Sequence, residues 1–273
     1  MATTVGQVQA AIESLWPVSG AEGWDAPGLL AGDPSAPVSR IHLAVDAVLD
    51  TVDEAIELGS DLLLVHHPLL LRGVTSVAAD RYKGAAITRL IKADCALVAA
   101  HTNADVVETG TSAALATALD LRDTRPIVAS NGIPSRGIGR VGALPAPTTL
   151  GALARRLAEI LPPTATGVRA SGEFDAPISI VALCGGAGDS LLSEPAVVGA
   201  DVYITSDLRH HPASEARENA RVAGGPALID ISHWASEWLW LEIAAAELRA
   251  ALPDVTVTVS ELRTDPWDFT VVQ

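Results

Sequence analysis

Apolar residues recur along the first part of the chain in short blocks whose spacing alternates between helical and strand-like. Residues 4–15 carry apolar side chains at helical spacing behind Thr4, which predicts an amphipathic helix capped by that threonine. Residues 40–45 alternate as a strand does, residues 50–58 have the pattern of a short helix, and the wholly apolar run 62–65 is typical of a central strand. The chain therefore begins with a helix, a strand, a helix and a second strand.

The same alternation continues beyond the second strand. The pattern predicts a helix over 84–91, a strand over 96–100 and a helix over 111–119, while the Gly- and Pro-rich residues 20–37 predict a loop. Strands that alternate with helices favour a mostly parallel sheet covered by helices on both faces.

A second α/β pattern follows a stretch rich in glycine and proline over residues 131–147, which predicts a boundary between two lobes. The elements predicted after it are helices over 149–160 and 232–251 and strands over 178–184, 202–205, 226–231 and 256–259. We therefore predict an α/β protein of two lobes, with mostly parallel or mixed sheets covered by helices.

Composition narrows the class of protein. With 49% hydrophobic residues among 273, the chain can bury a substantial core. Its 33 acidic and 18 basic residues give a net charge of −15, which repels phosphates and argues against a nucleic-acid partner. No apolar run reaches the roughly 18–20 residues of a membrane helix, and the N-terminus lacks a basic segment, so we expect a cytoplasmic protein with no membrane contact. Cys95 and Cys184 lie in apolar runs without a CxxC spacing and are predicted to be core residues.

Histidine is distributed selectively along the chain. Six of the seven histidines fall into four short clusters, two of which also contain a carboxylate four residues later. The clusters are His66-His67, His101 with Asp105, His210-His211, and His233 with Glu237. Imidazole and carboxylate together suit zinc, iron, nickel or manganese, so the pattern favours a metal site.

The pair His66-His67 directly follows the predicted central strand. Successive strand residues point to opposite faces, so the two rings share a site only if the chain leaves strand geometry there. Pro68 favours an extended conformation outside the helical region for His67, and parallel strands place ligands at their carboxyl ends. One core histidine and one surface histidine remain the alternative.

Two further clusters combine a histidine with a carboxylate. His233 and Glu237 are four residues apart at the start of a predicted helix, which places both side chains on one face. Asp105 follows His101 in a turn-prone segment, where it would either ligate a metal or cap a helix.

The glycine run Gly185–Gly188 precedes a helix predicted from Asp189. Its backbone N–H groups could cradle an anion, but the run lacks the Lys-Ser/Thr of a phosphate-binding P-loop. A tight turn is the other interpretation.

The number of donors bears on the number of metal ions. His66, His67, Asp105, His233 and Glu237 are more than one tetrahedral zinc ion uses. A carboxylate can bridge two ions, and pairs of ions about 3.5–4 Å apart recur in hydrolases. Two divalent ions per chain, whether zinc, iron, nickel or manganese, therefore fit the donors better than one.

Several segments together resemble a known family. They are Val65–Pro68, Ala100–Asp105, Gly137–Arg140, Leu183–Asp189, Val202–Asp207 and Asp230–Glu237. In order and spacing they resemble the GTP cyclohydrolase 1 type 2 homologs, also called NGG-one-interacting-factor-three-like proteins. Where that family usually has glycine, this chain has Ser206 and Ser232.

The resemblance implies a dinuclear metal centre and an assembly. The implied ligands are His66, His67, Asp105, His233 and Glu237. The implied assembly is a toroidal homohexamer of two-lobed chains, with metal sites facing an internal cavity. We assign residues 1–130 plus 226–273 to a metal-binding lobe and residues 131–225 to a second lobe.

The first functional hypothesis is a metal-dependent hydrolase in which activated water acts on a nucleotide or related small molecule. The family name implies cyclohydrolysis of GTP. His101, His210 and His211 are then candidates for orienting ligands or transferring protons. The alternatives are a metal-dependent phosphoesterase and, from a different class, a non-catalytic metal-binding scaffold or metallochaperone.

Overall fold

The computed structural model describes residues 2–130 and 132–272, so Asn131, the first residue of the predicted boundary, lies outside it. The chain forms two compact units. Unit 1 comprises Met1–Ala104 and Leu241–Thr264, and unit 2 comprises Asp105–Trp240 and Asp265–Gln273. The chain thus enters unit 2 and returns to unit 1, and three segments assigned above to the metal-binding lobe, 105–130, 226–240 and 265–273, belong to unit 2.

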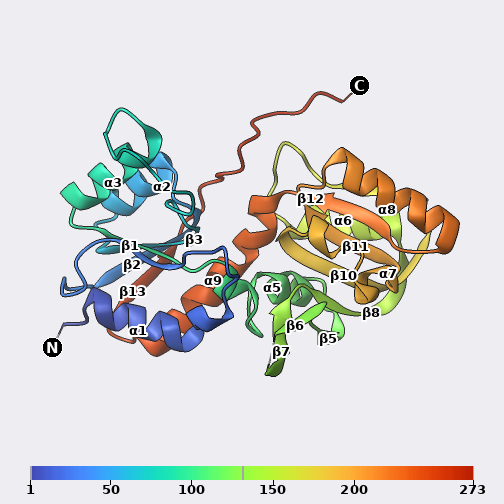
Figure 1. The fold of residues 1–273 in the computed structure, drawn as a ribbon, viewed down its shortest axis with the longest axis horizontal. Helices are drawn as coiled ribbons and strands as arrows, with labels where there is room; N and C mark the ends of the chain where they lie inside the picture. Colours follow the sequence, from blue (N-terminus) through green and yellow to red (C-terminus); the bar gives the residue numbers. More distant parts are fainter. Residues whose placement is uncertain (1, 131, 273) are drawn as a thin grey trace. The chain divides into compact units, whose positions relative to one another are not determined.

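Unit 1 is built on a five-stranded sheet with the order β1-β4-β3-β2-β13 (Figure 1). The strands are β1 (Gly28–Ala31), β2 (Arg40–Asp46), β3 (Leu62–His67), β4 (Ala96–Ala99) and β13 (Thr256–Val259). All neighbouring pairs are parallel except β1 with β4. The predicted parallel core is confirmed, whereas the prediction of a loop throughout residues 20–37 missed the antiparallel edge strand β1.

Helices cover both faces of this sheet, with α2 and α3 on one side and α1 on the other (Figure 1). They are α1 (Val5–Leu15), α2 (Leu49–Glu57) and α3 (Tyr82–Lys92), joined by the C-terminal part of α9 (His233–Ala251). Short turns η1 (Val18–Gly20) and α4 (Thr102–Asp105) complete the helical segments of this part of the chain. As predicted, Thr4 caps α1, in a reciprocal capping box with Gln7.

The core between the sheet and α2 and α3 follows directly from the apolar pattern. Leu63 and Val65 of β3 pack in one buried cluster with Val52 of α2 and Leu90 of α3. On the other face, Trp16 at the end of α1 is fully buried, and its Nε1 donates a hydrogen bond of 2.9 Å to Oε2 of Glu247 in α9. Each such side chain contributes about 1.5–3 kcal/mol by leaving water.

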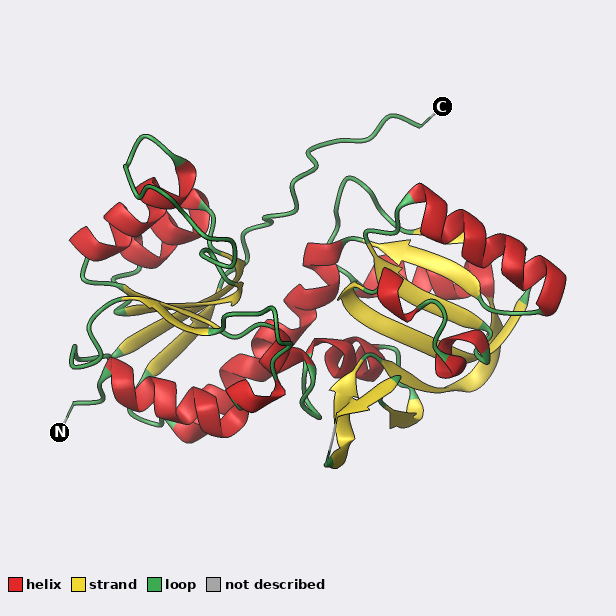
Figure 2. Ribbon diagram, in the orientation of Figure 1, coloured by secondary structure: helices red, strands yellow, loops and turns green. Residues whose placement is uncertain are grey.

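Unit 2 is built on a mixed six-stranded sheet with the order β5-β8-β10-β11-β12-β9, surrounded by helices (Figure 2). Its strands are β5 (Arg122–Arg125), β8 (Arg140–Thr149), β9 (Arg169–Ser171), β10 (Pro177–Ala187), β11 (Val202–Ser206) and β12 (Ala227–Ile231), and β6 (Val128–Ser130) and β7 (Ile133–Ile138) pair separately. Its helical segments are α5 (Thr111–Ala118), α6 (Leu150–Ile160), η2 (Asp189–Leu191), α7 (Pro195–Val198), α8 (His210–Ala223) and the start of α9. Strands β10, β11 and β12 are parallel, and the other pairings are antiparallel.

The structure differs from the predicted pattern of unit 2 in two places. Residues 133–138 and 140–147, within the stretch 131–147 predicted to be a boundary, lie in β7 and β8; the sheet register of β8 is irregular between Ala143 and Thr148, where its two prolines lie. Gly137 marks close strand packing instead of a loop, since a Cβ there would lie 2.1 Å from the Val128 carbonyl oxygen. Helix α8 was not predicted because it has no buried residue, so apolar periodicity could not reveal it.

None of the helices within residues 2–130 and 132–272 combines the length and the apolar character needed to cross a membrane.

In each unit, an aspartate just before a central strand accepts hydrogen bonds from the backbone of the neighbouring strand. Oδ2 of Asp61 accepts hydrogen bonds from the backbone N–H of Ser39 at 2.7 Å and of Arg40 at 2.9 Å, where β2 begins. Oδ2 of Asp201 likewise accepts from Ser179 and Ile180 of β10, both at 2.7 Å. Each carboxylate satisfies N–H groups at a place where the ladder offers them no acceptor.

The contribution of Asp61 depends on its charge. Burial acts to raise the pKa of Asp61, but the hydrogen bonds from Ser39 and Arg40 and the charge of Arg40 outweigh it, so the pKa lies below its ordinary 3.8. Folding therefore favours the carboxylate. The resulting stability is fully present above the ordinary pKa and is lost as the pH falls through the lowered one.

We expect Asp61→Ala to lower the free energy of unfolding by about 1–2 kcal/mol at pH 7, because two strand N–H groups lose their acceptor. The difference from the parent should shrink as the pH falls below about 4. Urea unfolding at several pH values measures both effects. The control Asp254→Ala removes an exposed carboxylate from the same unit and should change stability by less than about 0.5 kcal/mol. Equal urea midpoints for the two variants would contradict the assigned role.

Candidate metal centre

Three histidines gather at the carboxyl ends of β3 and β4 in unit 1. Each of His66, His67 and His101 offers a ring nitrogen, and these nitrogens lie within 4.8 Å of one another. The ring centroids of His66 and His67 are 5.0 Å apart, and those of His66 and His101 are 5.1 Å apart. The adjacent histidines share one cluster although both lie within β3, so the expectation that the chain must leave strand geometry between them was wrong.

Every ring in this cluster is anchored through Nδ1. His66 Nδ1 lies 2.9 Å from the backbone oxygen of Ala100, and His67 Nδ1 lies 2.8 Å from Oδ1 of Asp46. An oxygen that only accepts requires the nitrogen to donate, so Nδ1 carries the proton in each ring. The tautomer thus selected places the lone pair on Nε2, as in histidines that bind metals with a carboxylate or carbonyl behind them.

His101 is anchored by Asp25, which lies in a stretch predicted only as loop. Oδ1 of Asp25 is 2.9 Å from His101 Nδ1, and Oδ2 accepts from the Thr102 backbone N–H at 3.0 Å and from its hydroxyl at 2.5 Å. Burial acts to raise the pKa of Asp25, but the hydrogen bonds from Thr102 and His101 and the electrostatic interaction with His101 outweigh it and lower that pKa. Asp25 is therefore a carboxylate at neutral pH and holds the His101 ring in place.

Unit 2 presents a second group of donors on the first turn of α9. His233 Nε2 and Glu237 Oε1 are 2.9 Å apart, as their spacing of four residues predicts. His233 Nδ1 lies 2.7 Å from Oδ2 of Asp207, which follows β11. Ring and carboxylate are thus fixed in the same way as in unit 1.

Electrostatics keep His233 protonated when only protein surrounds it. Burial acts to lower the pKa of His233, but the charge of Glu237 and hydrogen bonds to Asp207 and Glu237 outweigh it and raise the pKa to about 11. A metal ion at Nε2 would therefore replace a proton, and the two negative carboxylates that favour the proton would also favour a metal cation.

The backbone of Gly186 lies close beside these donors. Its φ is +71°, and a Cβ at this position would lie 2.4 Å from Glu237 Oε1 and 3.2 Å from His233 Nε2. Its N–H donates to Ser236 Oγ at 2.9 Å, and the N–H of Gly185 donates to Ser112 Oγ at 3.1 Å. The anion cradle considered for this glycine run is not supported, because these N–H groups bond to the protein and β10 extends through the run. Close approach to the donors explains Gly186.

Asp105, the remaining predicted ligand, lies in unit 2 at the end of α4. Its Oδ1 accepts a short hydrogen bond from the hydroxyl of Thr111. Helix α5 begins after Gly110 with no side-chain cap, so Asp105 does not cap this helix. Burial, followed by the charges of Asp105 and Glu237, raises the pKa of the Cys184 thiol to about 12, so both carboxylates act on one buried group. Cys184 is a core thiol, as predicted.

His210 and His211 occupy another place in unit 2. Both are exposed at the start of α8, with ring centroids 5.2 Å apart. Among the residues that the structure describes, neither forms a potential metal-binding group with His233 and Glu237. Their participation in proton transfer stays a prediction, and His210 lines a groove of its own.

Sequence reasoning missed the three aspartates that anchor histidines. Asp46 is the last residue of β2 and Asp207 follows β11, so both stand at the carboxyl end of a parallel strand. That position was a usable signal, since it is where ligands of such sheets gather. Asp25 lies in an irregular segment and carries no comparable signal.

Comparison with known proteins places the chain in a family. Residues 3–266 match the family described as Duf34/NIF3 (NGG1p interacting factor 3). A Streptomyces coelicolor protein named GTP cyclohydrolase 1 type 2 homolog is 49% identical over 269 residues, covering 96% of this chain and 93% of its own. A Mycobacterium tuberculosis protein of the same name is 34% identical, with 98% of each chain covered.

Solved structures agree on the fold. The crystal structure of Staphylococcus aureus hypothetical protein SA1388 superposes with a TM-score of 0.90 at 28% identity, covering 99% of this chain and all of that one. A Bacillus cereus protein related to NIF3 has a TM-score of 0.91 at 23% identity, with 99% and 100% covered. The predicted α/β class is confirmed.

We expect Asp207→Asn to weaken zinc binding about tenfold or more, because the amide can accept from His233 Nδ1 but lacks the negative charge. The fold should persist, since the Asp207 side chain is 63% exposed and Asn tolerates its φ of 57°. Competition with a chromophoric chelator measures the affinity. Asp189→Asn, which removes a carboxylate paired with Arg209 in the same unit, should leave it unchanged. Equal loss in both variants would indicate only a general charge effect.

Proposed function

The chain belongs to the Duf34/NIF3 family, and we propose that His66, His67, Asp105, His233 and Glu237 together hold two divalent metal ions. The observation that carries this proposal is the common anchoring of the three histidine rings among them. Each has Nδ1 engaged by an oxygen, and each therefore directs Nε2 away from its support.

The donor chemistry fits such a centre. Three imidazoles and two carboxylates supply nitrogen and oxygen ligands, the set preferred by zinc, iron, nickel and manganese. Thiolate ligation finds no support, because neither group of possible metal donors among the described residues contains a cysteine. Gly186 adds room, since any larger residue there would collide with Glu237 Oε1.

We further propose that the protein is a hydrolase acting on a nucleotide or related small molecule, in line with relatives named GTP cyclohydrolase 1 type 2 homolog. Divalent ions would act as Lewis acids and lower the pKa of water. His101, held by the shielded carboxylate of Asp25, would orient the reacting group or transfer its proton. Its place beside His66 and His67 supports this role and makes it the residue to compare with the proposed ligands.

Metal content separates the ligands from their neighbours. We expect about two divalent ions per chain after reloading with metal, and preferential loss of one in Asp105→Asn, because a bridging carboxylate needs both charged oxygens. His101→Gln should retain both ions. Elemental analysis with melting temperatures measured in parallel tests this. One ion or none in the reloaded parent, or two in Asp105→Asn, would remove the support for a dinuclear centre.

The same proteins test catalysis. The metal-loaded parent should hydrolyse at least one member of a panel containing GTP and other nucleotides, and Asp105→Asn should lose that activity. Release of inorganic phosphate would identify a phosphoesterase, whereas a change in the purine absorbance would identify ring opening. A fully metallated parent inert towards the whole panel would favour the metal carrier or scaffold over the enzyme.

We also propose that the chain assembles as a toroidal homohexamer, as the family resemblance implies. The net charge of −15 opposes self-association, so an assembly must bury enough apolar surface to overcome repulsion. We expect light scattering at micromolar concentration and physiological salt to give six times the mass of the chain, with smaller species increasing at low salt, where repulsion is less screened. A monomer at physiological salt would refute the assembly.

A further inference from the structure

A groove in unit 2 separates helix α8 from strands β9 and β12. It has a volume of about 450 Å³ and continues into a neighbouring hollow of about 390 Å³, with Ser171, Arg217 and Leu228 lining both. Small-molecule sites commonly measure about 300–1,000 Å³. None of the five proposed metal donors lines either part, so this groove is distinct from the candidate metal centre.

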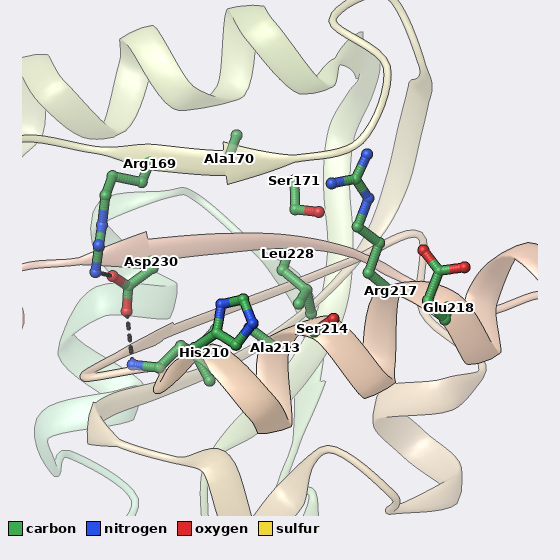
Figure 3. A pocket seen from close by; sticks show the side chains of 11 residues that line it. Arg169, Ala170, Ser171, His210, Ala213, Ser214, Arg217, Glu218, Leu228 and Asp230 are labelled. Atoms are coloured by element: carbon green, nitrogen blue, oxygen red, sulfur yellow. Dashed lines mark hydrogen bonds and ion pairs between the residues drawn. The ribbon is translucent and has the colours of Figure 1, made fainter. Parts of the chain in front are cut away.

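Polar donors enter the groove from both walls. Figure 3 shows Arg217 reaching from α8 towards β9, on the side where Ser171 lies, while the His210 ring lies nearer the start of the helix. Ser214, one turn after His210, also lines the groove. A guanidinium, two hydroxyls and an imidazole are thus presented by two separate elements.

Three arginines and three carboxylates line the groove and the neighbouring hollow, and most of them pair with one another. Asp230 is occupied by Arg169, with which it forms a short ion pair, and by the backbone N–H of Leu208 at 3.0 Å. Glu218 pairs with Arg221 at 3.1 Å. Arg217 has no ion-pair partner anywhere in residues 2–130 and 132–272. Glu173 lines only the neighbouring hollow, whereas Arg217 lines both parts, so Arg217 is the cation that the groove itself offers to an anionic ligand.

The number of donors identifies the kind of anion. A carboxylate presents two oxygens in one plane, whereas a phosphate monoester presents three terminal oxygens to surrounding donors. Arg217, Ser171 and Ser214 offer charged and neutral donors from different directions, and guanidinium pairs particularly well with phosphate. Leu228 and Ala213 supply an apolar surface beside them, more than a bare ion requires.

We propose that this groove binds a small organic phosphate, with Arg217, Ser171 and Ser214 on the phosphate and Leu228 and Ala213 against the organic part. His210 donates to the ligand at the end of the groove near Asp230. The site is independent of the proposed metal centre and of any reaction there.

The test titrates ribose 5-phosphate into the full chain by calorimetry. The parent should bind one equivalent saturably, ribose should bind far more weakly, and Arg217→Gln should weaken the complex about tenfold or more, because a charged hydrogen bond is lost. Arg125→Gln removes an exposed arginine from β5 of the same unit and should leave the affinity unchanged. Ser171→Ala provides a second, smaller truncation of the same site.

Metal removal distinguishes the groove from the candidate metal centre. Binding should persist after chelation and in Asp105→Asn, whether or not those proteins retain activity. Four results would overturn the proposal: no saturable binding, unchanged affinity in both Arg217→Gln and Ser171→Ala, loss of binding on chelation, or inorganic phosphate binding as tightly as ribose 5-phosphate. Loss of binding on chelation would indicate that the phosphate binds to the metal ions. Equally tight binding of inorganic phosphate would indicate that the groove does not recognise the organic part of the ligand.

Discussion

The hydrogen bond between a histidine Nδ1 and an oxygen acceptor is the interaction on which the candidate metal centre depends. A carboxylate serves His67, His101 and His233, and a backbone carbonyl serves His66. Each bond fixes both the tautomer and the direction of the ring before any ligand arrives. A ring that was free to rotate would lose rotamer freedom on binding, at a cost on the order of 1 kcal/mol for each ring. The hydrogen bonds that anchor the four histidines therefore reduce the entropy lost when a ligand binds.

The two sheets generate these anchors by one shared arrangement. Asp46 ends β2 and stands in register with His67 at the end of the neighbouring strand β3. In unit 2, Asp207 follows β11, and His233 follows the neighbouring parallel strand β12. A carboxylate at the end of one parallel strand thus holds an imidazole delivered by the next. Asp61 before β3 and Asp201 before β11 each hold the backbone of a neighbouring strand, but β3 delivers the histidine whereas β11 is followed by the carboxylate, so these two aspartates do not extend the shared arrangement.

The sequence predicted the features that depend on local residue spacing and missed those that depend on contacts between segments distant in the chain. Helix α1 could be predicted because the capping residue and the apolar stripe both indicate a helix over the same residues. The contact between His233 and Glu237 could be predicted because four residues complete about one helical turn. Strand β8 could not be predicted, because prolines are typical of linkers. Only the structure shows the irregular sheet register that accommodates them. Asp25 reaches His101 across 76 positions, and no local pattern carries information over that separation. The roles predicted for His210 and His211 rested on residue type alone, without geometry.

The raised pKa of His233 bears on how unit 2 behaves before metal arrives. With Nδ1–H donated to Asp207, a neutral His233 would turn the Nε2 lone pair towards Glu237 Oε1 at 2.9 Å, and the proton held with a pKa of about 11 makes that contact attractive at neutral pH. The positive charge of protonated His233 therefore keeps this ring in contact with the carboxylates of Asp207 and Glu237. A metal ion at Nε2 would replace this proton. Because proton and metal would compete for that nitrogen, the affinity of this group for a metal should rise with pH up to the pKa.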